Sequence, residues 1–358
     1  MMNHQYRIQR LRSELKKKNL DAFITGHLPN VRYLTGFSGS HGLSIVTGSK
    51  SFFLTDFRYK EQVRTQVTAD KTFIRGGNLV ESDAFRTIVA SSKRIGFEQR
   101  HLTVSEYFAL TKAVGKKKLV AVEGMVERLR SIKDADEIKI IKRAVEITDK
   151  VFQKILGKIR PGISELDISA EISFLHKKFG AENDAFDTIV ASGKRGALPH
   201  GSASLKKIQK NEFVTLDFGC IYNGYHSDMT RTVCVGRPTS KMKKVYSIVL
   251  DAQHKALEYI SVSASSKKAD TVARNHIAAH GFGKYFGHSL GHGVGLEIHE
   301  DLRLSQQSKE ILAEGNVVTV EPGIYLPGQF GVRIEDVVLV RHKGLEILSS
   351  SPKDLILL

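Results

Sequence analysis

The sequence has few cysteines, no long hydrophobic run and fewer acidic than basic residues. Its 358 residues include only two cysteines, Cys220 and Cys234, which are too few for a disulfide framework. No segment approaches the roughly 20 consecutive apolar residues of a membrane-spanning helix, and the first residues lack the apolar core of a secretory signal. These absences favour a protein of the reducing cytoplasm that does not cross a membrane. The apolar fraction of 41% excludes a disordered or fibrous chain.

The charge is basic, with 54 Lys and Arg against 38 Asp and Glu and a formal net charge of +16. Such an excess is found in proteins that bind polyanions. Here it is distributed along the chain in short lysine runs, without interleaved aromatic residues and without a nucleic-acid-binding motif. We therefore interpret the excess as a solvated surface and do not expect a nucleic-acid partner. A dedicated polyanion site is the alternative interpretation.

The length favours two domains, at roughly 150 residues per domain. An opening helix is expected at residues 4–18, where apolar residues recur on one face. Short β-like runs, separated by polar segments, then follow at 22–25, 43–47, 51–55 and 95–98. This alternation is typical of an α/β layer domain, which we place at residues 1–122. The segment 122–133 has no strong period and is predicted to be a linker.

A second pattern begins at Asp134 and belongs to the second domain, expected at residues 123–358. Asp134 and Glu137 have the spacing of a capping box, and apolar residues with a helical period follow them. Pro161 must end this helix, and Ser164 is expected to cap the next one.

The second domain contains two similar segments, and each consists of two helices followed by a β region. Ser240 is expected to cap the first helix of the second pair, whose second member is predicted at 268–280. Each segment contains a histidine after a glycine-rich turn, which is His200 in the first segment and His292 in the second. We infer a weak internal duplication, in which two helix pairs cover one curved antiparallel sheet.

The segment 211–236 predicts a β-hairpin that carries two carboxylates. Its strands are expected at 214–221 and 224–235, joined by the strong two-residue turn signal Asn223–Gly224. In that register Asp217 faces Thr230, so Asp217 and Asp228 lie on one face. Two acids on one face repel each other unless a cation lies between them. We favour a metal site over the alternative, a pair of surface aspartates beside the turn.

Two further segments supply metal-ligand residue types. His288, His292 and His299 lie within twelve residues that also contain three glycines, with Gly287 directly before them, and neutral imidazole is a common transition-metal ligand. Glu321 and Glu335 each end an apolar strand pattern. Isolated core or surface histidines, and a surface ladder of Arg and Glu, are the alternatives, but neither explains the whole set.

The combined donor set is four carboxylates and one imidazole: Asp217, Asp228, His292, Glu321 and Glu335. Hard oxygen ligands with one imidazole suit Mn²⁺, or else Co²⁺ or Zn²⁺, better than a thiolate-bound metal. Five ligands of this kind suit two ions about 3.5–4 Å apart that share a water molecule. We therefore predict two divalent metal ions per chain, with Mn²⁺ as the first candidate.

These residues stand in the motifs LDFG, SDMTRT, GHGVG, EPGIY and RIED. The motifs and their order along the chain resemble those of the M24 pita-bread metallopeptidases. The segments NVRYLTGFSGSHG and FLTDFRY resemble the creatinase/prolidase N-terminal domain. The resemblance covers the whole chain. It implies an α/β (α+β) fold in which an α/β domain precedes a pita-bread domain with a pseudo-twofold curved antiparallel sheet.

The resemblance also implies a reaction, the hydrolysis of the bond before proline in Xaa-Pro peptides. Glu321 corresponds to the family's proton shuttle, and His299 to a residue that stabilises the oxyanion. His288 and His299 correspond to the histidines that contact the scissile carbonyl and the proline side. His200, in LPHG, corresponds to the histidine near the substrate's N-terminal side, and Arg333 to an arginine that orients the metal ligands.

Several relatives with different activities remain as alternatives. We favour an Xaa-Pro dipeptidase, because Arg303 lies four residues after His299 and could bind the free carboxylate of a dipeptide. Archaeal-type prolidases look similar at this offset, although Arg303 could also be an ordinary loop charge. An Xaa-Pro aminopeptidase is the alternative, and the resemblance implies a homodimer for either enzyme.

More distant alternatives fit less well. Methionine aminopeptidases usually lack such an N-terminal domain, and creatinase works without this metal set. A non-catalytic pita-bread binding protein has no need of four clustered carboxylates.

Overall fold

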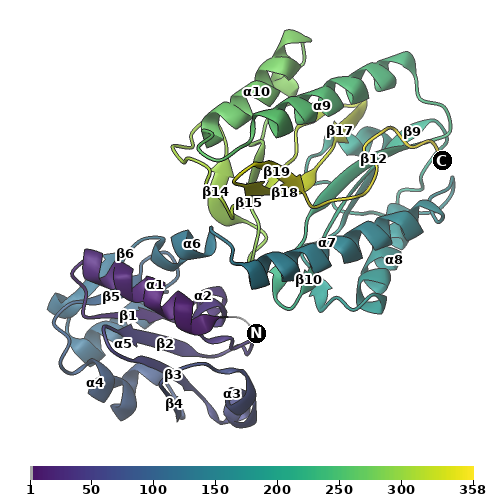
Figure 1. Cartoon of the computed structure of the whole chain (residues 1–358). Coiled ribbons are helices and arrows are strands. Elements are labelled where there is room, and N and C mark those ends of the chain that lie inside the picture. The colour runs from purple at the N-terminus through teal and green to yellow at the C-terminus, as the bar shows by residue number, and fades with distance from the viewer. Residues whose placement is uncertain (1–2) are drawn as a thin grey trace. The chain divides into compact units, whose positions relative to one another are not determined.

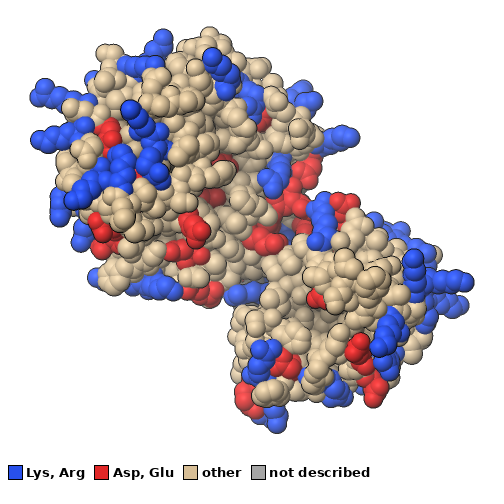
Figure 2. Space-filling model, turned by 180° about the vertical axis from the view of Figure 1, so that it is seen from behind, with Lys and Arg blue, Asp and Glu red and all other residues tan. Residues whose placement is uncertain are grey.

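The computed structural model of the chain describes residues 3–358 (Figure 1). The chain divides after Arg130 into two compact units, and we describe each by itself. Among the described residues, no helix is both long enough and apolar enough to span a membrane. Lys and Arg side chains are spread over the visible surface of both units (Figure 2), which agrees with a solvated basic surface.

The N-terminal unit is built on a six-stranded mixed sheet in the order β4-β3-β2-β1-β5-β6. Its strands are β1 (Ala22–Thr25), β2 (Leu43–Thr47), β3 (Ser51–Thr55), β4 (Lys71–Ile74), β5 (Ile95–Glu98) and β6 (Leu119–Val122). The pairs β1–β2 and β2–β3 are antiparallel, whereas β3–β4, β1–β5 and β5–β6 are parallel. The four strands predicted from the sequence are confirmed as β1, β2, β3 and β5.

Helices pack on both faces of this sheet. They are α1 (His4–Lys17), α2 (Leu28–Thr35), α3 (Lys60–Gln66), α4 (Asp83–Val89), α5 (Val104–Val114) and α6 (Met125–Arg130). Ile24 of β1 packs in one cluster with Phe85 of α4 and Leu110 of α5. Phe53 of β3 packs with Val31 of α2 in another cluster.

The segment 122–133, predicted to be a linker, instead contains the helix α6. Its Met125, Val126 and Leu129 are buried, so this helix belongs to the N-terminal unit. Six residues are too few to display a helical period in the sequence. The two compact units therefore separate after Arg130, eight residues beyond the boundary expected at residue 122.

The second unit contains two helix pairs: α7 (Ala135–Leu156) with α8 (Glu165–Lys178), and α9 (Ser240–Tyr259) with α10 (Ser266–Ala279). Asp134 and Ser164 cap α7 and α8 through capping boxes, as predicted. The cap of α9 is Thr239 rather than Ser240, which is its first helical residue. Both residue types are good caps, so the sequence alone does not distinguish them.

The strands of the second unit pair in antiparallel sheets. Their bounds are β7 (Asn183–Asp184), β8 (Ile189–Ser192), β9 (Glu212–Phe218), β10 (Cys220–Tyr222), β11 (Tyr225–His226), β12 (Met229–Val235), β13 (Gly291–Gly293), β14 (Glu300–Leu304), β15 (Val317–Val320), β16 (Gly323–Leu326), β17 (Phe330–Arg333), β18 (Asp336–Arg341) and β19 (Gly344–Ile347). The pair α7 and α8 packs against β8, β9 and β12, and the pair α9 and α10 packs against β15 to β18 (Figure 1). The expected antiparallel strands covered by two helix pairs are confirmed, although in the described residues these strands form four hydrogen-bonded sheets rather than one curved sheet.

The predicted hairpin has the expected turn and register. Asn223 and Gly224 have φ angles of 45° and 76°, the left-handed values that a two-residue type I′ turn requires. Asp217 pairs with Thr230 across the β9–β12 ladder, as predicted.

Each arm of the hairpin is divided into two strands rather than continuous. Both backbone polar groups of Cys220 bind Ser227, at 2.9 Å in each case, and pairing then passes to the small sheet β7–β10–β11. The predicted strand 214–221 is therefore interrupted between β9 and β10.

Candidate active site

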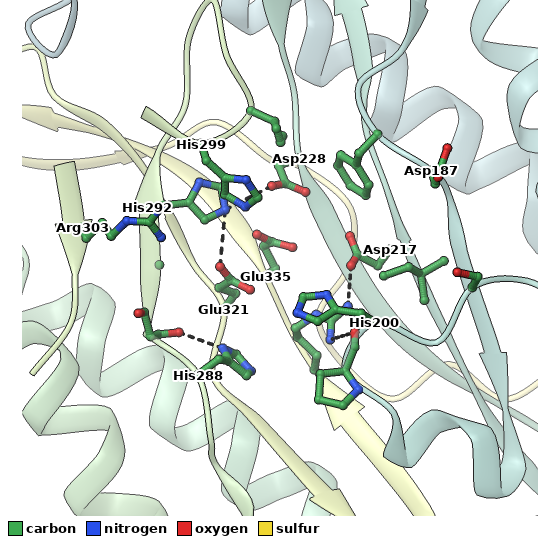
Figure 3. A pocket seen from close by; sticks show the side chains of 18 residues that line it. Asp187, His200, Asp217, Asp228, His288, His292, His299, Arg303, Glu321 and Glu335 are labelled. Atoms are coloured by element: carbon green, nitrogen blue, oxygen red, sulfur yellow. Dashed lines mark hydrogen bonds and ion pairs between the residues drawn. The ribbon is translucent and has the colours of Figure 1, made fainter. Parts of the chain in front are cut away.

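A cavity of about 470 Å³ lies in the second unit, and all ten site residues singled out in the sequence line it (Figure 3). They are His200, Asp217, Asp228, His288, His292, His299, Arg303, Glu321, Arg333 and Glu335. Apolar side chains that the motifs did not indicate also line the cavity, namely Phe186, Ile189, Pro199 and Ile298. The cavity thus combines a charged interior with apolar walls.

The carboxylates come from both halves of the duplicated domain. Asp217 lies on β9 and Asp228 immediately precedes β12, whereas Glu335 lies between β17 and β18. Thr230 of β12 joins the halves, because its hydroxyl donates to Glu335 Oε2 at 2.8 Å and its carbonyl accepts from the Glu335 backbone at 3.1 Å. Sequence reasoning did not identify this role of Thr230, although the residue stands in the SDMTRT motif.

His292 directs a ring nitrogen at two carboxylates. Its Nε2 lies 3.5 Å from an oxygen of Asp228 and 3.5 Å from an oxygen of Glu321. Its Nδ1 lies 3.1 Å from the carbonyl of Gly293. A carbonyl only accepts hydrogen bonds, so Nδ1 carries the proton in this contact and Nε2 directs a lone pair at the carboxylates. Such a space between acceptors suits a cation.

Burial and mutual repulsion perturb the carboxyl groups. Burial, followed by the charge of Asp217, raises the pKa of Asp228 well above its usual range. Burial, followed by the charge of Asp228, raises the pKa of Glu335 in the same way. Burial also raises the pKa of Glu321, to about 8. Each shift reflects the cost of holding several negative charges together away from water.

The donor set fits divalent cations. Ligand atoms of Asp228, His292 and Glu335 all lie within 4.8 Å of one another. The buried Oε1 of Glu335 has no hydrogen-bond partner within residues 3–358, and buried acceptors are rarely left without a partner. A hard cation would satisfy this oxygen and offset the repulsion among the carboxylates.

Arg333 and Tyr325 connect one ligand to His288. The Nη2 of Arg333 donates to Asp217, and its Nη1 donates to the Tyr325 hydroxyl at 2.8 Å. That hydroxyl lies 2.8 Å from Nε2 of His288, whose Nδ1 contacts the carbonyl of Ser289 at 2.8 Å. Burial is the main cause that lowers the pKa of His288 to about 4. His288 is therefore neutral near pH 7 and accepts a hydrogen bond from Tyr325.

Helix α10 holds the loop that carries His288 and His292. The guanidinium of Arg274 donates to the carbonyl of His288 at 2.7 Å, and Asp270 accepts from the backbone of Leu290 at 3.1 Å. Asp270 and Arg274 also form an ion pair at 2.8 Å. No motif indicated these two residues, because their role depends on the packing of α10 against the loop.

A second strand pair places Arg303 beside the ligands. Arg303 of β14 pairs with His292 of β13 in the ladder, and the ring of His299 packs edge-on against His292 with centroids 4.2 Å apart. Burial, followed by the charge of Arg303, lowers the pKa of His299. The guanidinium of Arg303 has no ion pair with any residue in the described part of the chain. It is a free cation at the cavity wall (Figure 3).

Comparisons with known proteins identify the family of the chain. Residues 139–342 match the model of metallopeptidase family M24, and residues 7–132 match the creatinase/prolidase N-terminal domain. An uncharacterized peptidase of Bacillus subtilis is 45% identical over 352 residues, which are 98% of this chain and 100% of the relative.

Two solved structures extend the likeness to the fold. An Xaa-Pro dipeptidase from Bacillus anthracis is 44% identical with a TM-score of 0.96, over 99% of this chain and 100% of the other. An X-Pro aminopeptidase from Thermotoga maritima is 36% identical with a TM-score of 0.90, over 96% of this chain and 100% of the other. The chain therefore belongs to metallopeptidase family M24 and carries a creatinase/prolidase N-terminal domain before its catalytic unit.

Proposed function

We propose that the protein is an Xaa-Pro dipeptidase that hydrolyses the bond before a C-terminal proline. The observation that carries this proposal is the free guanidinium of Arg303 at the cavity wall, beside His292 and His299. A dipeptide ends in a carboxylate close to the bond that is cleaved, and an arginine fork is its natural partner. The likeness to an Xaa-Pro dipeptidase supports the same assignment.

The five predicted ligands would hold two divalent ions per chain: Asp217, Asp228, His292, Glu321 and Glu335. We propose Mn²⁺, with Co²⁺ or Zn²⁺ as alternatives, because the donors are mostly hard oxygens. When bound, such ions acidify water and polarise a carbonyl group.

Residues of the chain would transfer the proton, stabilise the oxyanion and contact the substrate. Glu321, ionised once the cations are bound, accepts the proton of the attacking water and passes it to the proline nitrogen that leaves. His299 donates to the oxyanion. His288 has both ring nitrogens engaged, so it contacts the substrate with the face of its ring. His200 lies nearest to the substrate's amino end.

Specificity for proline follows from shape. The bond before proline has no N–H, and the ring fixes the backbone angle, so a pocket can be built around the ring. The apolar wall residues Phe186, Ile189 and Ile298 suit such a pocket.

An Xaa-Pro aminopeptidase is the second candidate, because the chain also shares its fold and 36% of its sequence with an X-Pro aminopeptidase from Thermotoga maritima. We also propose a homodimer, which sedimentation would test by a species of twice the chain mass.

The two cysteines are buried and unpaired, in agreement with a reducing cytoplasm.

The test compares Ala-Pro with Ala-Pro-Ala as substrates. Arg303→Ala should lower kcat/KM for Ala-Pro roughly ten- to hundred-fold, since a hydrogen bond to a charged group is worth ~1.5–3 kcal/mol. Ala-Pro-Ala should change much less. Arg303→Lys should recover only part, because an ammonium group lacks the fork. Arg237→Ala, an exposed arginine outside the cavity, is the matched control.

Two outcomes contradict the proposal. If wild-type protein prefers Ala-Pro-Ala, aminopeptidase is the better assignment. If Arg303→Ala loses both activities equally, Arg303 does not select the length of the substrate.

A further inference from the structure

A buried ion pair joins the start of the second unit to the strand that follows His299. Lys133 Nζ lies 2.8 Å from Glu300 Oε2, and the two side chains are only 1% and 4% exposed. The residues lie 167 positions apart in the chain, and both belong to the second unit. Glu300 is the first residue of β14 and directly follows His299. The pair therefore lies next to a side chain of the proposed catalytic site.

The backbone around Lys133 is held in place by the turn before β15. The N–H of Lys133 donates to the carbonyl of Gly315 at 2.9 Å, and the side-chain amide of Asn316 donates to the carbonyl of Ser131 at 2.8 Å. Ile132 and Asn316 also form an antiparallel β-bridge. The last residues of the segment that was predicted to be a linker are thus bound to the second unit. Lys133 presents its ammonium group from this anchored backbone.

The other oxygen of Glu300 holds the segment 294–299. Glu300 Oε1 accepts a hydrogen bond from the backbone N–H of Leu296 at 3.1 Å. The carboxylate also packs against Gly295, where a Cβ atom would come within 2.3 Å of Oε1, so a larger residue there would displace the carboxylate. Glu300 thus uses one oxygen for Lys133 and the other for this segment.

This segment forms part of the cavity wall. Ile298 and His299 line the cavity, and His299 lies beside the proposed metal ligands (Figure 3). The far end of the segment is bound by the backbone of His226, whose N–H donates to the carbonyl of Gly295 at 2.8 Å. A shift of the Glu300 carboxylate would therefore move the two cavity residues, which lie between these anchors.

An ion pair that only stabilises the fold is the alternative explanation. Removing two charges from water costs about as much free energy as their attraction returns, so a buried ion pair is a poor source of stability. Apolar side chains could fill the same space at lower cost. The pair does supply a definite position for the Glu300 carboxylate, because one oxygen must meet Lys133 and the other must meet Leu296.

We propose that Lys133 and Glu300 are positioning residues that hold His299 and Ile298 at the substrate. Lys133 orients the Glu300 carboxylate, and the carboxylate orients the segment that ends in His299. This inference rests on the proposed function, in which His299 donates to the oxyanion. A displaced donor loses its hydrogen bond to the transition state more than it weakens contacts with the bound substrate. The loss should therefore appear in kcat rather than in KM.

The test measures hydrolysis of Ala-Pro at saturating Mn²⁺ by Lys133→Met, which keeps the length of the side chain and removes its charge. We expect kcat to fall at least about tenfold and KM to change less than about threefold. The double variant Lys133→Met with Glu300→Gln should recover part of kcat, because no buried charge is left unpaired. Lys142→Met, which breaks a surface pair with Glu346, is the matched control and should keep kcat.

A double-mutant cycle separates positioning from a general loss of stability. If Lys133 acts through His299, Lys133→Met should lower kcat much less in a His299→Ala background than in wild type. Equal losses in both backgrounds, or an unchanged kcat in Lys133→Met, would overturn the proposal. If Lys133→Met does not fold, Glu300→Gln replaces it in the same cycle, with the same expected result.

Amide hydrogen exchange gives a readout that needs no substrate. Peptides that cover residues 294–300 should exchange faster in Lys133→Met than in wild type, whereas peptides of α8 should be unchanged. Equal exchange in residues 294–300 would contradict the proposal. If wild-type protein cleaves neither Ala-Pro nor Ala-Pro-Ala, the proposed function fails, and exchange in this segment still decides whether Lys133 holds it.

Discussion

Arg333 donates a hydrogen bond to Asp217 on the buried floor of the cavity. The same guanidinium donates to Tyr325 and to the Thr230 hydroxyl, at 2.8 and 3.0 Å. Arg333 stands on β17 and Asp217 on β9, so this contact joins the two halves of the duplicated domain. It also places one fixed positive charge among carboxylates that repel one another.

Arg333→Lys should therefore weaken the site even though the charge is kept. An ammonium group cannot donate to Asp217, Thr230 and Tyr325 at once, and each lost hydrogen bond to a charged group is worth ~1.5–3 kcal/mol. We expect at least a tenfold loss of kcat at saturating metal. Arg341→Lys, which alters a surface pair with Glu346, is the control. Unchanged kcat in Arg333→Lys would exclude the orienting role.

Activity should depend on divalent metal. The clustered carboxylates and the unpartnered Glu335 Oε1 require cations for the arrangement to be stable and active. Chelator-treated protein should be inactive, and metal analysis after reconstitution with Mn²⁺ should give close to two ions at the catalytic site. Full activity in metal-free protein would refute the prediction.

Glu321→Gln should reduce turnover more than it reduces substrate binding. The amide keeps the shape of the side chain but cannot carry a proton between water and the leaving nitrogen. We expect a loss of at least a hundredfold in kcat, with a smaller change in KM. Because Glu321 is also a proposed ligand, metal occupancy must be measured on the same sample. Near wild-type kcat with both ions present would exclude the shuttle.

Metal binding should release protons. Without a cation, the pKa of Glu321 is about 8 and those of Asp228 and Glu335 are also raised, so these groups hold protons that a metal must displace. Apparent metal affinity should therefore rise as the pH approaches about 8. Titration calorimetry in two buffers with different ionisation enthalpies checks this, and identical heats in both would contradict it.

The same shifts set the stability of the metal-free protein. A raised pKa means that the folded state binds more protons than the unfolded state, so stability falls as pH rises. For Glu321 the loss should occur between its ordinary pKa of 4.5 and about 8. Urea unfolding in the presence of chelator, compared between wild type and Glu321→Gln, measures this. The variant should lose less stability than wild type as the pH rises, and equal losses would contradict the prediction.

Features that depend on neighbours in the chain could be predicted from the sequence. The caps Asp134 and Ser164 and the turn at Asn223–Gly224 involve contacts over a few residues, and their residue types determine the local geometry. This turn sets the strand register that places Asp217 opposite Thr230. All ten site residues that were singled out in the sequence line the cavity, and their individual roles stay predictions.

The tertiary structure alone decided which distant side chains meet. Thr230 binds Glu335 and Arg231 binds Asp336, each across about 100 residues, and neither contact leaves a local pattern. The short helix α6 forms because its apolar residues are buried against the N-terminal unit, not because its sequence is periodic. The contact between His101 and Glu127, 26 residues apart in the chain, likewise exists only after folding. Sequence specifies local geometry through backbone preferences, whereas the position of a charge relative to its partners depends on how separate elements pack.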